Sequence, residues 1–146
     1  MNENRLLYFF ERKVRDHMTT DVVSVTPSHR LRDLGELIER HDFNAFPVLD
    51  GGKLVGVITK FDFMRAFAFT EAHPIPHYDT LMDTPVRNSM REALVTVSPE
   101  TPLTRVLQQM VELKVRSFPV VAGERLVGMI SREDIIKALN ESVGRA

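Results

Sequence analysis

The sequence predicts a mixed α/β (α+β) protein built from two β-α-β-β-α repeats that are related by a pseudo-two-fold axis and pack sheet to sheet. The first observation is a repeat: Gly56 and Gly128 are 72 residues apart, and so are Phe46 and Phe118. A constant offset of this size indicates two copies of one structural unit. The second observation is that each copy holds patterns for only three strands and two helices. So small a sheet cannot bury both faces alone, so we expect the two sheets to cover each other.

The composition is that of an ordinary soluble globular protein. The chain has 146 residues, of which 43% are hydrophobic and 27% charged, and its formal net charge is −1. So small a charge gives no field that would attract nucleic acid or an anionic membrane. The absence of cysteine excludes disulfides and thiolate sites, and no apolar run approaches the length of a membrane span. We expect a cytoplasmic protein that binds neither nucleic acid nor membrane.

An N-terminal helical segment, residues 1–13, precedes the first repeat, and its helix is expected to reach about Arg15. Leu6, Leu7 and Phe10 fall near helical spacing. An isolated helix this short is marginal in water, so its apolar residues need a partner surface.

The first repeat, residues 14–72, shows the order strand, helix, strand, strand, helix. A β-branched run forms the first strand, and Thr26-Pro27 ends it. The glycine pair Gly51-Gly52 between two apolar runs is typical of a hairpin turn. The predicted elements are a strand at 22–25, a helix at 31–41, strands at 45–49 and 54–58, and a helix from 59 to about 70.

The second repeat, residues 86–146, follows a proline-containing connector, residues 73–85, in which no regular element is expected. Thr101 is predicted as an N-cap and Pro102 as the first residue of the helix after it. The predicted elements are a strand at 94–97, a helix at 103–113, strands at 117–121 and 126–130, and a helix at 131–140.

Several short motifs recur in register in the two copies, and together they resemble a tandem pair of CBS domains, named for cystathionine beta-synthase. The resemblance covers residues 14–140. One departure is Ala122, which stands where the first copy has Asp50, in a turn away from any expected ligand. The motifs are Met18, residues 23–27, residues 46–50 and residues 56–62 in the first copy, and Met90, residues 95–99, residues 118–121 and residues 128–134 in the second.

The resemblance implies a stand-alone regulatory module rather than an enzyme. Such a module binds an adenosyl ligand (AMP, ADP, ATP or S-adenosylmethionine) in clefts between the two repeats. It requires no cofactor. Since no catalytic domain accompanies the repeats, the output is expected to go to an unidentified partner protein, and the resemblance also implies a homodimer.

By this resemblance, Asp62 and Asp134 would accept hydrogen bonds from the ribose hydroxyls, because a carboxylate offers two acceptor oxygens. Thr59 and Ser131 would donate to the ribose or the phosphate at a helix N-terminus. The same residues also fit a capping box, in which a hydroxyl and an acidic residue three positions later cap a helix without any ligand. Asp is shorter than the Glu usual in such a box, so we expect its carboxylate to be freer.

The adenine would be enclosed, again by resemblance, by aliphatic side chains of the first strand and by backbone of the second strand in each repeat. These residues are Val23, Val25, Val95 and Val97, with Phe46, Pro47, Phe118 and Pro119.

The second copy is richer in arginine. Arg116 and Arg132 stand where the first copy has Asn44 and Lys60. A guanidinium offers forked donors to a phosphate, so these two arginines are predicted to bind the phosphate of the ligand. The alternative is a pair of solvated surface arginines.

Three other features bear on function. His73 and His77 have helical i, i+4 spacing, but Pro74 and Pro76 make a helix there improbable, so no metal site is expected. No catalytic set of residues can be assigned. The runner-up function is a ligand-free dimerisation module.

The last helix of the first copy carries Phe61 and Phe69, where the second copy has glutamate. Exposed phenylalanines would form an apolar patch that soluble monomers usually avoid. We expect a homodimer in which Phe61 or Phe69 is largely buried by a second subunit or by the N-terminal segment.

Overall fold

The computed structural model of the chain describes residues 3–68, 77–92 and 94–144. Its contacts divide the chain into two compact units: unit 1 contains Met1–Val22 and Val95–Ala146, and unit 2 contains Val23–Leu94. Each unit holds one two-stranded antiparallel sheet together with helices. The predicted mixed α/β class with two copies of one plan is confirmed.

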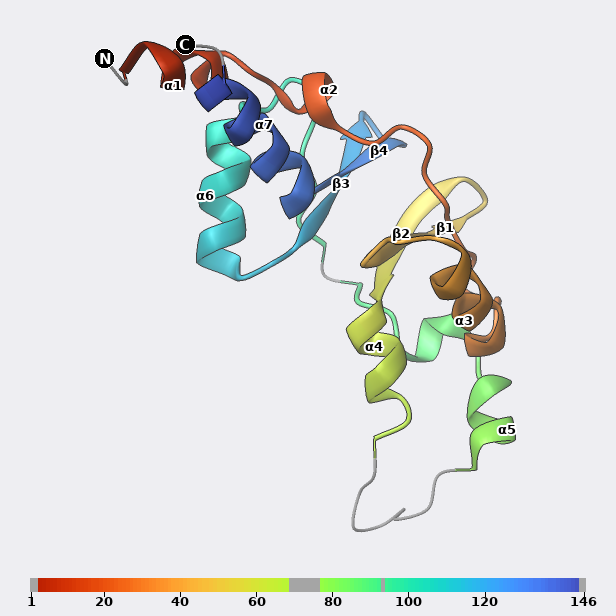
Figure 1. Ribbon diagram of the computed structural model, residues 1–146. Helices are drawn as coiled ribbons and strands as arrows, with labels where there is room; N and C mark the ends of the chain where they lie inside the picture. Colours follow the sequence, from red (N-terminus) through yellow and green to blue (C-terminus); the bar gives the residue numbers. More distant parts are fainter. Residues whose placement is uncertain (1–2, 69–76, 93, 145–146) are drawn as a thin grey trace. The chain divides into compact units, whose positions relative to one another are not determined.

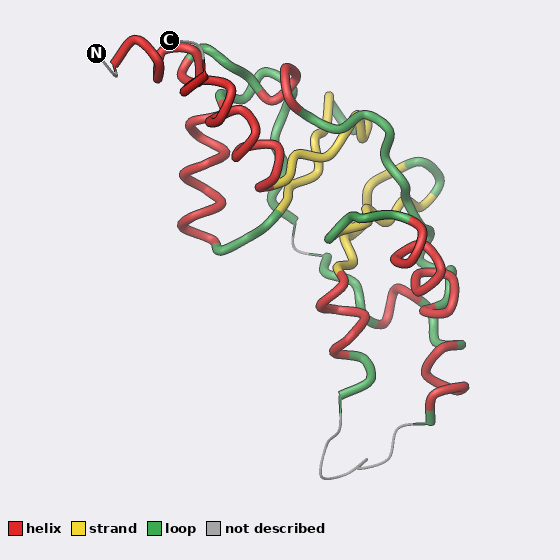
Figure 2. Tube along the Cα trace, viewed as in Figure 1, coloured by secondary structure: helices red, strands yellow, loops and turns green. Residues whose placement is uncertain are grey.

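Unit 2 is built around the first hairpin, whose second strand runs directly into a helix (Figure 2). At the start of this unit, the buried residue Val25 forms a bridge to Val48 of the hairpin, and the longest helix of the unit follows. The elements are α3 (Leu31–Arg40), β1 (Ala45–Asp50), β2 (Lys53–Thr59), α4 (Lys60–Arg65), α5 (Tyr78–Met82) and a 3₁₀ turn (Val86–Asn88).

Unit 1 repeats this plan and adds the N-terminal helices. Figure 1 shows α1 beside the C-terminal end of α7, and the two helices are in contact. The elements are α1 (Glu3–Phe10), α2 (Val14–His17), α6 (Leu103–Leu113), β3 (Ser117–Ala122), β4 (Arg125–Ser131) and α7 (Arg132–Gly144).

The predicted first strand of each repeat is wrong in length, because each is reduced to a single bridge residue. Val25 donates its N–H to Pro47 O at 3.0 Å and accepts from Leu49 N at 2.8 Å. The next bond of a parallel ladder would need the N–H of Pro47 for the carbonyl of Val23, and proline has none. Val97 and Pro119 repeat the arrangement in unit 1.

Other helix boundaries differ from the predictions for local reasons. The N-terminal helix does not reach Arg15, because Lys13 is extended and forms a bridge with Pro102. Pro102 itself is the N-cap of α6 rather than its first residue, and Thr101 Oγ1 accepts from Ser98 N instead.

The helix predicted from residue 59 to about 70 is α4, which ends at Arg65. Turns follow, in which Phe67 N donates to Met64 O and Ala68 N to Arg65 O, and residues 69–70 lie outside the described residues. The connector contains a short helix, α5, that was not expected. Its first residue, Tyr78, stacks on Phe67 with 5.8 Å between the ring centroids.

Each unit has its own hydrophobic core. In both, an aromatic residue of the first hairpin strand and leucines of the main helix are buried together, as their helical and alternating spacing requires. The core of unit 1 includes Phe9, Val14, Val97, Leu103, Val106, Phe118, Val120, Ile130 and Ile135, and that of unit 2 includes Val25, Leu31, Leu34, Phe46, Val48, Ile58 and Val86.

The free edge of each hairpin is covered by a segment near the start of the other sequence repeat. In unit 1, Thr19 N donates to Met129 O at 2.8 Å and Met129 N returns a bond to Thr19 O at 2.9 Å. In unit 2, Val57 and Arg91 exchange the equivalent two bonds at 3.0 and 2.9 Å. This pairing explains the repeated glycine of the second strand: a Cβ on Gly128 would lie 2.7 Å from Thr19 O.

Lys13 and Arg15, at the start of α2, form a charged cluster with Glu100. Lys13 Nζ lies 3.0 Å and Arg15 Nη1 2.7 Å from the Glu100 carboxylate. The pKa of Glu100 lies below its ordinary value, chiefly through the hydrogen bond from Lys13, with the charge of Arg15 adding to the effect.

A carboxylate whose folded pKa is lowered stabilises the fold above its unfolded pKa, and this stabilisation is lost as the pH falls through the lowered value. We therefore expect Glu100→Gln to lower the thermal midpoint slightly at pH 7, where the pair is solvent-exposed and screened by salt, and to lower it less near pH 3. Thermal melts at both pH values measure this difference, with Glu124→Gln in the exposed β3–β4 turn as the control. A Glu100→Gln deficit that persists unchanged at pH 3 would contradict it.

Candidate functional site

Both predicted S/T-x-x-D sequences form complete capping boxes. At α4, Asp62 N donates to Thr59 Oγ1 at 3.0 Å, and Thr59 N donates to Asp62 Oδ2 at 3.0 Å. At α7, the matching distances between Ser131 and Asp134 are 3.2 and 2.8 Å. The shorter Asp side chain was expected to leave its carboxylate freer, but it still reaches the N-cap N–H, so one oxygen of each carboxylate is already used by the cap.

The two aspartates differ in the groups that donate hydrogen bonds to their second carboxylate oxygen. Asp62 is completely buried, and its Oδ1 accepts from Arg65 Nη2 at 3.1 Å and from Arg91 Nε at 3.2 Å. With the cap, three donors engage this carboxylate. A ribose hydroxyl could reach it only by displacing a guanidinium.

Asp134 has no such partners among the described residues: its only hydrogen bonds are those of the cap. It borders a polar cavity of about 400 Å³ in unit 1, between the N-terminal segment and α7. The remaining lining residues are Tyr8, Arg12, Asp16, His17, Met18, Lys137 and Glu141. Asp134 is thus the aspartate with acceptor capacity to spare.

The helix N-termini offer fewer donors than an anion site would need. Arg132 N donates to Arg116 O at 2.8 Å, and Lys60 N donates to Asn44 O at 3.0 Å. Together with the caps, these bonds use most of the first-turn N–H groups. The Ser131 hydroxyl accepts from Asp134 N and keeps its own proton to donate.

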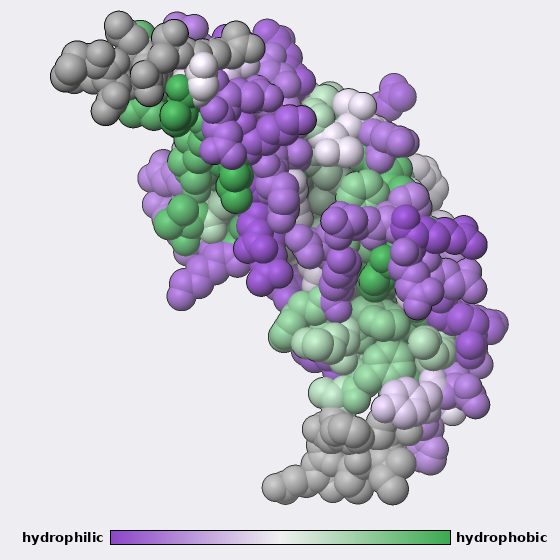
Figure 3. Space-filling view, viewed as in Figure 1, coloured by the Kyte–Doolittle hydropathy of each residue, from purple (hydrophilic) through white to green (hydrophobic). Residues whose placement is uncertain are grey.

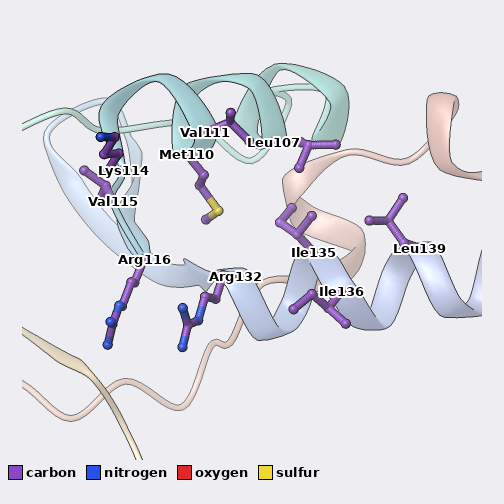
Figure 4. Close-up of a pocket in the computed structure, with 10 residues that line it drawn as sticks. All are labelled: Leu107, Met110, Val111, Lys114, Val115, Arg116, Arg132, Ile135, Ile136 and Leu139. Carbon is purple, nitrogen blue, oxygen red and sulfur yellow. The ribbon is translucent and has the colours of Figure 1, made fainter.

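The structure brings Arg116 and Arg132 together. Their side chains extend side by side at one end of a groove between α6 and α7 (Figure 4). The groove has a volume of about 360 Å³ and is otherwise mostly apolar, with Lys114 as a third cation. Asp134 does not line this groove, since it faces the polar cavity instead.

Most residues predicted to enclose the adenine lie in the cores. Val25 and Val97 are buried, and the carbonyls of Pro47 and Pro119 already accept the N–H groups of those two valines. Phe46 and Phe118 are buried in the same clusters. Exposed apolar surface is left by Val95, which is 42% exposed, and by the partly buried Val23.

Two functional positions were missed from the sequence, Arg65 and Arg91. The signal was present in the repeat, because their counterparts at the 72-residue offset are Lys137 and Thr19. Arg91 belongs to the second copy in sequence but to unit 2 in the structure, so unit 2 has a second arginine where unit 1 has the uncharged Thr19.

Among the described residues, no group of three His, Cys, Asp or Glu side chains could hold a metal ion. Within the same part of the chain, no helix is long and apolar enough to cross a membrane. His73, one of the two histidines considered above, lies outside the described residues.

Comparison with known proteins identifies the repeats. A family model of the CBS domain matches residues 14–69 and 85–141. CBS domain-containing protein YhcV of Bacillus subtilis (strain 168) is 31% identical over 136 residues, which cover 91% of this chain and 91% of YhcV. The A-adding tRNA nucleotidyltransferase of Geobacter sulfurreducens is 30% identical over 137 residues, or 92% of this chain. The chain spans only 14% of the length of that enzyme and 46% of another curated relative.

Among solved structures, that of CBSX2 in complex with AMP aligns with a TM-score of 0.74 at 25% identity. The alignment covers 88% of this chain and 96% of CBSX2. The similarity thus extends over both sequence repeats.

Proposed function

The chain belongs to the CBS-domain family, and on this premise we propose that it is a regulatory module that binds an adenosyl compound and signals to a partner protein. The observation that carries the proposal is Asp134, a carboxylate with one oxygen in a helix cap and the rest of its acceptor capacity open to a polar cavity. The AMP bound to the similar protein CBSX2 supports an adenine nucleotide as the ligand.

In this proposal the Asp134 carboxylate accepts from the ribose hydroxyls, and the Ser131 hydroxyl donates to the ligand. Such charge-assisted hydrogen bonds are about twice as strong as neutral ones. The exposed surface of Val95 and Val23 is the part of the predicted adenine enclosure that remains open to a ligand. The sheet-to-sheet packing of the two repeats that would complete the enclosure stays a prediction, as do the cytoplasmic location and the signalling to a partner protein.

Arg116 and Arg132 remain our proposed phosphate ligands, since two forked cations lie together at one end of the α6–α7 groove. Neither arginine lines the Asp134 cavity, so a single ligand would have to contact both the cavity and the groove. Comparing AMP with adenosine tests this contact directly, because only AMP carries the phosphate.

The proposed function is tested by titrating the purified protein with AMP, ADP, ATP, S-adenosylmethionine and adenosine, first by thermal shift and then by calorimetry. A ligand that binds only the folded state stabilises it by RT ln(1 + [L]/Kd), or about 2.7 kcal/mol at a hundredfold excess over Kd. A specific shift with at least one of these compounds is expected. No shift with any of them at millimolar concentration would refute the proposal.

A second candidate function, a ligand-free dimerisation module, is favoured by the apolar surface of the helices. Hydrophobic side chains gather over α6 and the adjoining face of α7 (green in Figure 3), where Val111 and Ile136 are exposed. On α4, Phe61 is 54% exposed in the single chain, and Met64 is exposed beside it. Phe69 lies outside the described residues. We propose that a second copy of the chain covers these surfaces.

Phe61→Glu introduces the residue that the second repeat carries at the same place, Glu133. If Phe61 is buried between subunits, this buried charge should shift the protein from dimer to monomer. Light scattering coupled to size-exclusion chromatography measures the mass. Lys53→Glu, a charge change in the exposed β1–β2 turn, should leave the mass unchanged. A Phe61→Glu variant that stays dimeric and folded would remove Phe61 from the interface.

A further inference from the structure

The two capping boxes are the same in sequence pattern but not in their surroundings, and the difference comes from two positions. Asp62 meets Arg65 and Arg91, whereas the equivalent positions around Asp134 are Lys137 and Thr19. Threonine cannot form an ion pair with a carboxylate. Unit 2 therefore contains an ion-pair cluster at its capping aspartate that unit 1 lacks among its described residues.

The backbone places Arg91 for this contact. Its N–H and C=O are both bonded to Val57, at 2.9 and 3.0 Å, along the edge of β2. Val57 lies two residues before the N-cap Thr59, so the backbone of Arg91 is fixed close to the start of α4. Thr19 is fixed in the same way on Met129, beside the start of α7.

We infer that Arg91 is an intramolecular latch that occupies the ribose-accepting carboxylate of Asp62, so that the resting chain binds its adenosyl ligand through Asp134 alone. This inference rests on the proposed function and specifies which half of the repeat pair carries it. Arg91 Nε sits 3.2 Å from Asp62 Oδ1, the atom that a ribose hydroxyl would need. Arg65 occupies the same oxygen from one turn further along the helix.

The latch can be removed without leaving a buried charge unpaired. The Arg91 side chain is about half exposed, at 54%, so its loss opens no cavity in the core. Because Arg65 holds the same oxygen, the test variant, Arg91→Thr, also carries Arg65→Lys, so that unit 2 has the two residues that surround Asp134, Lys137 and Thr19. Asp62 would keep its hydrogen bonds with Thr59 and a cation one turn along the helix. This double variant should therefore fold, which circular dichroism and a thermal melt can verify.

A reciprocal exchange of residues 19 and 91 in the full-length protein tests the latch, with AMP as the probe and calorimetry as the readout. Wild type is expected to bind one AMP per chain. Arg91→Thr combined with Arg65→Lys should bind a second AMP, and adding Asp62→Ala should remove that second event only. Thr19→Arg should install the latch beside Asp134 and weaken the original event about tenfold or more, the loss expected for hydrogen bonds to a charged group.

The matched control is Arg87→Thr, an exposed arginine of the same segment without an ion pair among the described residues, which should leave the isotherm of the wild type unchanged. If the double variant gains no second event, or if wild type already binds a second AMP that Asp62→Ala removes, the latch is refuted. The wild-type isotherm decides separately on the proposed function: binding by wild type without a gain in the double variant refutes the latch alone. Absence of binding in every variant refutes both.

Discussion

Replacing Asp134 with alanine is expected to weaken AMP binding by about 1.5–3 kcal/mol, the usual contribution of hydrogen bonds to a charged group. That energy corresponds to roughly a 10- to 150-fold rise in Kd. The effect should be large because the carboxylate has acceptor capacity beyond its cap, beside a polar cavity. Calorimetric titration with AMP measures it.

Asp62→Ala is the matched control, since it removes the same residue from the same kind of cap. Because Arg65 and Arg91 already engage Asp62, this variant should lose stability and leave AMP affinity near that of the wild type. Asp134→Ala itself should stay folded, because a lost cap costs only about 1 kcal/mol. Equal affinity in wild type and both variants would mean that the two aspartates serve only as caps.

The second large effect is expected on stability, from Gly128→Ala. The added Cβ would lie 2.7 Å from Thr19 O and 3.1 Å from Met18 Sδ. The methionine can move, but Thr19 is held by two backbone bonds to Met129. Overpacking of this kind typically costs about 1–3 kcal/mol. Urea unfolding monitored by circular dichroism should show the lower midpoint.

Gly144→Ala is the control for this prediction. It adds the same methyl group near the end of α7, where nothing lies within 4 Å of the new Cβ. Its midpoint should match or slightly exceed that of the wild type, since alanine favours a helix more than glycine does. A Gly128→Ala midpoint equal to that of Gly144→Ala would show that the Thr19 segment is not held against β4.

The hairpins could be predicted from the sequence because local signals determine them. A glycine turn between two apolar runs specifies each one, and the observed strands extend each prediction by only one or two residues. The first strand of each repeat could not be predicted in length. Its limit is the missing N–H of Pro47, a residue on a different strand that is paired through tertiary contact.

The candidate site also has a part that could be predicted from the sequence and a part that could not. The S/T-x-x-D pattern gave the caps at Thr59 and Ser131, which are local in sequence. The pattern could not show that Asp62 meets Arg91, because that partner is 29 residues away and comes from the segment that covers β2. Comparing the two copies position by position would have marked Arg91 as unusual, since its counterpart is Thr19.

The covering of each hairpin edge by a segment near the start of the other repeat has a consequence for synthesis on the ribosome. Unit 2 is one continuous stretch, Val23–Leu94, and all of its parts have left the ribosome before unit 1 has its second strand. Unit 1 joins the first 22 residues to the last third of the chain. During translation the N-terminal helices therefore cannot pack into unit 1 until β4 has been made. These helices carry Phe9 and Val14 of the unit 1 core, and until then their apolar side chains stay accessible to chaperones.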